Sequence, residues 1–406
     1  MPDISLSFEV HQPYRLKRGF AYERPPENVA LEDIFDLYFD DQRNRAIFEK
    51  VAKKCYYPST EILLEGIDEH KKDKRKFKVS FSLSGVFIEQ CERYDKNLLD
   101  LFRQLADTGC VEFLAQTYYH SLASLYEQKN EYLEQIEMHE QAMRDLVGYT
   151  PTFFENTELL YNNEIAGIIR ELGYKGIFTE GMERVLGWRS PNYVYRAKSD
   201  GMKVLFRNYL LTDDIGFRFS AKDWEEYPLT ADKYAAWLDA TSGQCINLFM
   251  DYETLGEHHW TDTGIHNFLR FLPDEVLKCS NLRFSTPSGI AKKFKAMDEI
   301  DIGVYSTISW ADLQRDTSCW LGNEMQILCY ELIKRMEKKV KSTGNWELLK
   351  IWRYFQMSDH LYYASTVGGA SGEVHNYFSP YGTPVEAFVT LYTIITDFER
   401  RFFTTE

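Results

Sequence analysis

The stretch PTFFENTE at residues 151–158 and the stretch LFMDYETLG at residues 248–256 are the most informative segments of this 406-residue chain. Each begins with apolar residues typical of a buried β-strand and then changes abruptly to carboxylates. After Glu158 a helical pattern continues to Leu172 and ends at Gly173. In barrels of alternating strands and helices, reactive groups lie where the strands end. These stretches therefore predict an active site at the carboxyl ends of strands.

Glu158 and Asp251 are the acidic residues on which this prediction depends. Two carboxyl groups in one cleft can act as acid and nucleophile when their surroundings push their pKa values apart. Cleavage of a glycosidic bond requires such a pair. The simpler interpretations are that Glu158 is a carboxylate at the N-terminus of a helix and that Asp251 caps a strand.

Further strands, with helices between them, are expected in the first 300 residues. Strand patterns lie at 4–10, 77–82, 110–115, 174–179, 201–207 and 282–286, in addition to the two stretches above. Helical patterns lie within 27–75, 98–105, 125–147 and 230–240, whereas 211–216 has the character of a loop. Seven or eight strands that alternate with helices or long loops predict an α/β fold with a parallel sheet closed as a barrel.

The character of the sequence changes from about residue 305. Residues 324–340, 346–364 and 384–403 have apolar side chains three and four positions apart, which is typical of amphipathic helices. We therefore expect a C-terminal α-helical bundle packed on the barrel. A glycine-rich loop at 367–372 interrupts these helices, and its composition suggests a mobile lid over the cleft.

The composition excludes several classes of protein. The net charge is −15 and no long basic tract occurs, so no nucleic-acid partner is expected. No apolar run is long enough to span a membrane, and the first residues lack the pattern of a signal peptide. Seven scattered cysteines without a C-x-x-C pair predict reduced thiols in a cytoplasmic protein.

Five short motifs occur in order along the chain. They are HQP at 11–13, GVFIE at 85–89, FENTE at 154–158, DYETLGEH at 251–258 and MSDHLYY at 357–363. Together they resemble the five ordered regions of glycoside hydrolase family 57, the α-amylase and 4-α-glucanotransferase family. Each motif alone is weak evidence, but five in the same order over nearly the whole chain are strong evidence.

The resemblance implies both a fold and a reaction. The fold would be an incomplete (β/α)7 TIM-like barrel over residues 1–300, followed by a C-terminal helical domain over residues 301–406 that completes the cleft. Glu158 would be the nucleophile and Asp251 the general acid/base in retaining cleavage of α-1,4-glucosidic bonds through a covalent glycosyl-enzyme. An apolar neighbour such as Trp260 would raise the pKa of Asp251, so that it is protonated when it donates.

Other polar or aromatic residues in or near the motifs are expected to bind the substrate. They are His11, Gln12, Glu89, His120, Glu253, His258, Trp260, Asp359 and His360. If residues 346–364 form one helix, Asp359 shares a face with Trp352 and Phe355, so its carboxylate needs polar partners. For each isolated histidine or acidic residue, the alternative is a purely structural role.

An α-amylase-like hydrolase without a cofactor or a metal ion is therefore the first prediction, with an α-glucan or malto-oligosaccharide as its substrate. A 4-α-glucanotransferase or branching enzyme is second, because acceptor subsites and water exclusion decide between these activities. Two alternatives belong to another class: a non-catalytic glucan-binding protein and a metal-dependent polysaccharide deacetylase. The deacetylase would place His258 and His259 with Asp251 and His11 around a metal, although adjacent histidines point in different directions.

Overall fold

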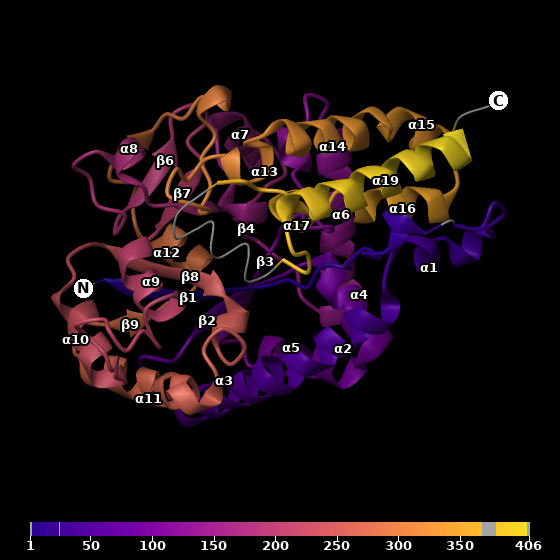
Figure 1. Cartoon of the computed structure of the whole chain (residues 1–406). Coiled ribbons are helices and arrows are strands. Elements are labelled where there is room, and N and C mark those ends of the chain that lie inside the picture. Colours follow the sequence, from indigo (N-terminus) through magenta and orange to yellow (C-terminus); the bar gives the residue numbers. More distant parts are fainter. Residues whose placement is uncertain (1, 24, 368–378, 404–406) are drawn as a thin grey trace.

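The computed structural model describes residues 2–23, 25–367 and 379–403. These residues form two β-sheets surrounded by helices, with a largely helical region beside them (Figure 1). The strands are β1 Asp3–Val10, β2 Val79–Leu83, β3 Val111–Leu114, β4 Phe154–Glu155, β5 Ile177–Glu180, β6 Val194–Ala197, β7 Lys203–Arg207, β8 Cys245–Asp251, β9 Arg283–Phe284 and β10 Glu299–Ile300.

The sheets are mostly parallel. The first has the order β3-β2-β1-β8, with β9 also beside β1, and the second has the order β10-β6-β7-β5-β4. Among the described strands, only β6 and β7 pair in antiparallel fashion. Hydrogen bonds at both junctions join the sheets: for example, the Glu155 N–H donates to the Ala115 carbonyl at 2.9 Å, and the Asn208 N–H donates to the Asn247 carbonyl at 2.8 Å. The carboxyl ends of the parallel strands consequently share one edge.

Helices cover the sheets and bury the faces of the strands. Up to residue 293 they are α1 Ile34–Tyr38, α2 Asp41–Val51, α3 Tyr57–Glu69, α4 Gly85–Tyr94, α5 Lys96–Asp107, α6 Asn130–Ala142, α7 Asn163–Glu171, α8 Glu183–Leu186, α9 Tyr209–Gly216, α10 Ala231–Ala240, α11 Ile265–Lys278 and α12 Pro287–Lys293. All eight residues of β1 are buried, as is usual for a strand with parallel neighbours on both sides. Helix α5 shows why the amphipathic segments become helices: its apolar residues three and four apart, Leu98, Phe102 and Leu105, are all buried in the same core.

The C-terminal part is helical, as expected. Its helices are α13 Ser318–Leu321, α14 Glu324–Arg335, α15 Glu337–Ser342, α16 Trp346–Tyr354, α17 Ser358–Tyr362 and α19 Pro384–Phe403. The prediction of one continuous helix over 346–364 is wrong, because the chain breaks between α16 and α17, where Met357 has non-helical backbone angles. The lid suggested for the glycine-rich loop falls on residues 368–372, which lie outside the described residues.

Two local predictions in the first 300 residues are also wrong. Residues 211–216 form most of α9 instead of a loop, because the Asn208 side chain accepts the Leu211 N–H at 3.1 Å and starts a helix there. The helix expected directly after Glu158 begins only at Asn163, and a single 3₁₀ turn, η6 Thr157–Leu159, precedes it.

The helical region includes elements from the N-terminal part of the chain. Helix α1 packs on α16 (Figure 1), and the ring of Phe35 lies 5.8 Å from that of Tyr354. The ring of Tyr38 likewise contacts Phe355 at 5.8 Å and Phe398 at 6.1 Å. One continuous apolar core therefore links α1, α6, α14, α16 and α19.

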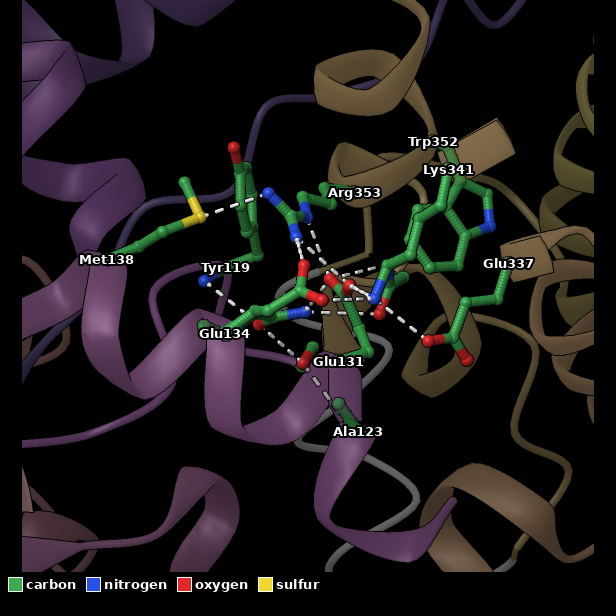
Figure 2. A network of polar contacts seen from close by, with 12 residues as sticks. Tyr119, Ala123, Glu131, Glu134, Met138, Glu337, Lys341, Trp352 and Arg353 are labelled. Atoms are coloured by element: carbon green, nitrogen blue, oxygen red, sulfur yellow. Dashed lines mark hydrogen bonds and ion pairs between the residues drawn. The ribbon is translucent and has the colours of Figure 1, made fainter. Parts of the chain in front are cut away.

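A buried ion pair fastens α6 to the C-terminal helices (Figure 2). The Arg353 guanidinium donates to both carboxylate oxygens of Glu131, at 2.8 and 3.1 Å, and the Lys341 ammonium lies 2.8 Å from the same carboxylate. The side chains of Glu131 and Arg353 are almost fully buried, at 0% and 3% exposure. Glu131 also accepts hydrogen bonds from Gln135 and Gln356. This polar cluster crosses the core between the two parts of the chain.

A search of the described residues for a helix that is both long and apolar enough to cross a membrane finds none.

Candidate active site

Glu158 lies in the turn that follows β4, and both of its carboxylate oxygens accept hydrogen bonds. The Trp310 indole N–H donates to Oε2 at 2.7 Å, and the Ser358 hydroxyl donates to Oε1 at 2.8 Å. The Trp310 backbone N–H also donates to the Glu158 carbonyl at 3.3 Å. A carboxylate fixed by donors on both oxygens points in one direction, as a nucleophile must.

The backbone around Glu158 is strained. Glu158 and Leu159 have φ angles of 59° and 53°, in the left-handed region that residues with a side chain rarely adopt. His120, which contacts Glu158, has a φ of 48°. Such conformations cost of order 1–3 kcal/mol each and persist where the surroundings fix them, typically at functional sites. Glu158 is therefore not a helix N-terminal carboxylate, since it precedes α7 in a separate strained turn.

Asp251 ends β8, opposite Glu9 at the end of β1. Burial, followed by the negative charge of Glu158, raises the pKa of Asp251 from its usual value to about 7, although Arg207 and His120 oppose the shift. The shift indicates that the charge of Glu158 reaches Asp251. The site thus contains one carboxylate with donors on both oxygens and one carboxyl group whose pKa is raised toward neutral pH.

Two stacked histidines lie beside these carboxyl groups. The rings of His11 and His120 are 4.1 Å apart. His11 Nε2 lies 2.9 Å from Asp359 Oδ2, and His120 Nε2 lies 3.5 Å from Glu158 Oε1. Burial would lower the pKa of His120, but the hydrogen bond and charge of Glu158 outweigh it and raise that pKa, whereas burial and the nearby His120 lower the pKa of His11.

Asp359 is the link between the helical region and the sheet edge. It is in the first turn of α17 and pairs with His11, which follows β1. Burial alone would raise its pKa, but the charge and hydrogen bond of His11 bring the pKa well below its ordinary value. The polar partner expected for this carboxylate is thus a histidine of the first motif.

Three other acidic residues at the sheet edge are buried. Burial raises the pKa of Glu9 well above its ordinary value, and it raises the pKa of Glu155 and of Glu253 to about 8. Glu253 accepts hydrogen bonds from the Tyr56 hydroxyl and from the Gln12 amide. Gln12 and Glu253 therefore contact each other, next to the group formed by Glu158, Asp251 and the histidines.

Four further residues were expected to bind the substrate: Glu89, His258, Trp260 and His360. Glu89 accepts hydrogen bonds from the hydroxyls of Tyr118 and Tyr354, so it connects α4 to the helical region. Trp260 is 57% exposed, and the Lys54 ammonium lies 4.9 Å from its ring centre. Burial lowers the pKa of His360 to about 4 and that of His258 to about 3.

Trp310 and Ser358, which hold Glu158, were not among the predicted residues. Trp310 lies 152 positions from Glu158 in a segment without a recognisable motif, so the sequence carries no signal for it. Ser358 does have a signal, because it directly precedes Asp359 in the fifth motif.

Within 2–23, 25–367 and 379–403, no three histidine, cysteine, aspartate or glutamate side chains are grouped so that they could hold a metal ion. His259, which the deacetylase alternative would use, is instead engaged by Ser220 and the Gly216 carbonyl.

Comparison with known proteins identifies the family. Residues 5–303 match the model of glycosyl hydrolase family 57. A protein of Methanocaldococcus jannaschii, provisionally named an alpha-amylase, is 48% identical over 404 residues, which are 98% of this chain and 84% of that protein.

Solved structures of lower identity share the fold. The 4-alpha-glucanotransferase of Thermococcus litoralis superposes with a TM-score of 0.70 at 18% identity, over 98% of this chain and 60% of that chain. The GH57-type branching enzyme of Pyrococcus horikoshii gives a TM-score of 0.67 at 15% identity, over 99% of this chain and 95% of that chain. These matches are to α/β proteins of the same kind, with a helical C-terminal region. The chain belongs to glycosyl hydrolase family 57.

Proposed function

We propose that this glycoside hydrolase cleaves α-1,4-glucosidic bonds with retention of configuration, with Glu158 as nucleophile and Asp251 as general acid/base. The observation that carries the proposal is the contrast between the two carboxyl groups. Glu158 accepts hydrogen bonds on both oxygens, while burial and the charge of Glu158 raise the pKa of Asp251 to about 7. A retaining glycosidase needs one ionised carboxylate and one protonated carboxyl group.

The two steps follow from this assignment. In the first, a Glu158 oxygen forms a bond to the anomeric carbon as the glycosidic bond breaks, and Asp251 gives its proton to the leaving oxygen. In the second, water gives a proton to Asp251 as its oxygen attacks the same carbon, and the ester to Glu158 breaks. A sugar hydroxyl in place of water would give transfer instead of hydrolysis.

The substrate class rests on the relatives. The 48% identical relative is named for alpha-amylase activity, and the two solved structures are named for transfer and branching reactions. We accordingly propose an α-glucan or malto-oligosaccharide as substrate, with hydrolysis as the first assignment. Transferase activity is the second candidate, since an acceptor sugar would react at the same Glu158 ester.

The finer architecture and location are also proposals. We infer that β1, β2, β3, β4, β5, β7 and β8 close as an incomplete (β/α)7 barrel, with the catalytic barrel over 1–300 and the helical domain over 301–406. The Ala115–Glu155 and Asn208–Asn247 hydrogen bonds between the sheets support this closure. All seven cysteines are free thiols, which supports a reducing compartment such as the cytoplasm.

Product analysis with a short malto-oligosaccharide tests the function. Shorter products alone mean hydrolysis, whereas shorter and longer products together mean transfer. Both Glu158→Ala and Asp251→Ala should lose turnover. If the native chain binds the glucan without turnover, and both variants bind equally well, the protein is a glucan-binding protein and the proposal is wrong.

A further inference from the structure

His120 is held from both sides by groups of different chemistry. Its Nδ1 lies 3.0 Å from Gln116 Oε1 and 3.5 Å from Glu9 Oε1, and its Nε2 lies 3.5 Å from Glu158 Oε1. Gln116 is fully buried, His120 is 3% exposed, and the imidazole stacks on His11. The ring cannot exchange the places of its two nitrogens without losing these contacts.

The hydrogen bonds behind Gln116 fix the orientation of its amide. Gln116 Nε2 donates to Ser82 Oγ at 2.8 Å, and the Ser82 hydroxyl in turn donates to Glu155 Oε2 at 2.9 Å. The carbonyl oxygen of Gln116 then faces His120, and a carbonyl oxygen can only accept a hydrogen bond.

We propose that Gln116 is a positioning residue that keeps a hydrogen on Nδ1 of His120, so that only Nε2, facing Glu158, gains or loses a proton. The importance of this for catalysis rests on the proposed role of Glu158. A protonated Nε2 places a cation beside the carboxylate, whereas a deprotonated Nε2 turns a lone pair toward it. His120 is consequently a cation while Glu158 is ionised, and it holds its second proton less tightly once Glu158 is esterified.

The charges around His120 favour the cationic form of its ring, which the proposal also requires. The titratable groups that face it are Glu9 of β1, His11 after β1, Glu155 of β4, Glu158 of η6, Asp251 of β8 and Asp359 of α17. Burial opposes the cation, but the carboxyl groups outweigh burial, and the pKa of His120 is raised. Without Gln116, a neutral ring could instead place its one hydrogen on Nε2 and donate to Glu158.

The tautomer of His120 tests the proposal directly. Nitrogen-15 NMR of histidine-labelled protein distinguishes the two neutral tautomers, and His120→Asn assigns the signal. In the native chain His120 should change from the cation to the Nδ1–H form as pH rises. Gln116→Met, which keeps the size but offers only a weak acceptor, should favour Nε2–H. Gln116→Glu, a neutral acid when buried, can accept and donate like the amide and should keep Nδ1–H. An Nε2–H tautomer in the native chain would overturn the proposal.

The pH dependence of turnover adds a second readout. In Gln116→Met we expect kcat on a malto-oligosaccharide to fall about tenfold with KM little changed, because a charge-assisted hydrogen bond beside the nucleophile is weakened. The fall of kcat on the alkaline side of the pH profile should also move to lower pH. Gln116→Glu should restore the native profile. The matched control is Gln326→Met. Gln326 is equally buried, but it donates to the Cys319 and Leu361 carbonyls in the helical region.

The control should lower thermal stability and leave the tautomer and the pH profile unchanged. An unchanged profile in Gln116→Met, or an equal shift in Gln326→Met, would contradict the proposal. If Gln116→Met does not fold, Ser82→Ala decides, because it frees the amide to turn: a mixture of tautomers supports the proposal, and the native tautomer alone contradicts it. NMR needs no turnover, so inactivity on α-glucans would count against the proposed function while still leaving the role of Gln116 measurable.

Discussion

At the scale of single residues, Glu158 differs from the other acidic residues of the sheet edge in its donors and its backbone. Trp310 and Ser358 donate to its two oxygens, and its φ of 59° lies in the left-handed region. Glu155, three residues earlier, is buried with its pKa raised to about 8. The strained turn therefore gives two acidic residues only three positions apart very different surroundings.

The first prediction concerns the proton on Asp251. Since the general acid must be protonated, kcat/KM should fall as pH rises past about 7. In Glu158→Gln the negative charge is gone, so the pKa of Asp251 should move down toward its ordinary value. Carbon-13 NMR of labelled aspartate can follow this in the inactive variant. Glu89→Gln is the control, because Glu89 is not among the groups that shift Asp251, and an equal shift there would contradict the account.

The second prediction concerns the indole that holds Glu158. Trp310→Phe keeps an aromatic ring but removes the N–H donor 2.7 Å from Oε2. Hydrogen bonds to charged groups contribute about 1.5–3 kcal/mol, so kcat should fall at least about tenfold. Steady-state kinetics should show no such fall for Trp346→Phe, at a half-exposed position of α16. Equal losses in both variants would mean that Trp310 acts only through packing.

At the scale of elements, the sequence motifs predict where strands end but not how the following turns fold. The apolar-to-acidic change locates β4 and β8 and the carboxyl groups at their ends, because burial of a strand requires an apolar run. The 3₁₀ turn at Glu158 and the break between α16 and α17 have no periodic signal, since tertiary contacts fix them. The pairing of His11 with Asp359, 348 positions apart, likewise depends on the fold alone.

The third prediction tests the junction of β1, the π-helical turn Ala52–Tyr56 and the 3₁₀ turn Tyr252–Thr254. Glu253 lies there with a pKa raised by burial from 4.5 to about 8. The folded state holds this proton more tightly than the unfolded state, so its contribution to the free energy of unfolding falls as pH rises from about 4.5 to about 8. Glu253→Gln removes that dependence and can still accept from Tyr56.

Urea unfolding of the native chain and of Glu253→Gln at pH 5 and pH 8 measures the effect. The variant should gain stability relative to the native chain at the higher pH. Exposed Glu49→Gln is the control and should show no such difference. A native-like pH dependence in Glu253→Gln would show that Glu253 is ionised in the folded protein.

At the scale of the whole molecule, the site is assembled from parts that are distant in the chain. The sheet edge supplies Glu158, Asp251 and the histidines, and the helical region supplies Ser358 and Asp359. The alternation of elements and the C-terminal helices could be predicted from hydrophobic periodicity. The packing of α1 on α16 could not, because amphipathic faces do not specify their partners.

The fourth prediction concerns the cluster that joins α6 to the C-terminal helices (Figure 2). Arg353→Met leaves the buried Glu131 carboxylate with only part of its partners, so the free energy of unfolding should fall by about 3–5 kcal/mol. The control is Arg335→Met, which removes a surface pair between Arg335 and Glu399 and should cost about 1 kcal/mol or less. Denaturant unfolding measures both, and similar losses would contradict a special role for the buried pair.

The central claim is that Glu158 forms the covalent intermediate, and trapping that intermediate tests it most directly. Asp251→Asn treated with an α-malto-oligosaccharyl fluoride should accumulate a glycosyl-enzyme, because fluoride leaves without an acid while the second step lacks its base. Fragment mass spectrometry of the peptide over residues 151–162 should place the added sugar on Glu158 and not on Glu155. A label on another residue, or none while the native enzyme turns over the same fluoride, would contradict the account.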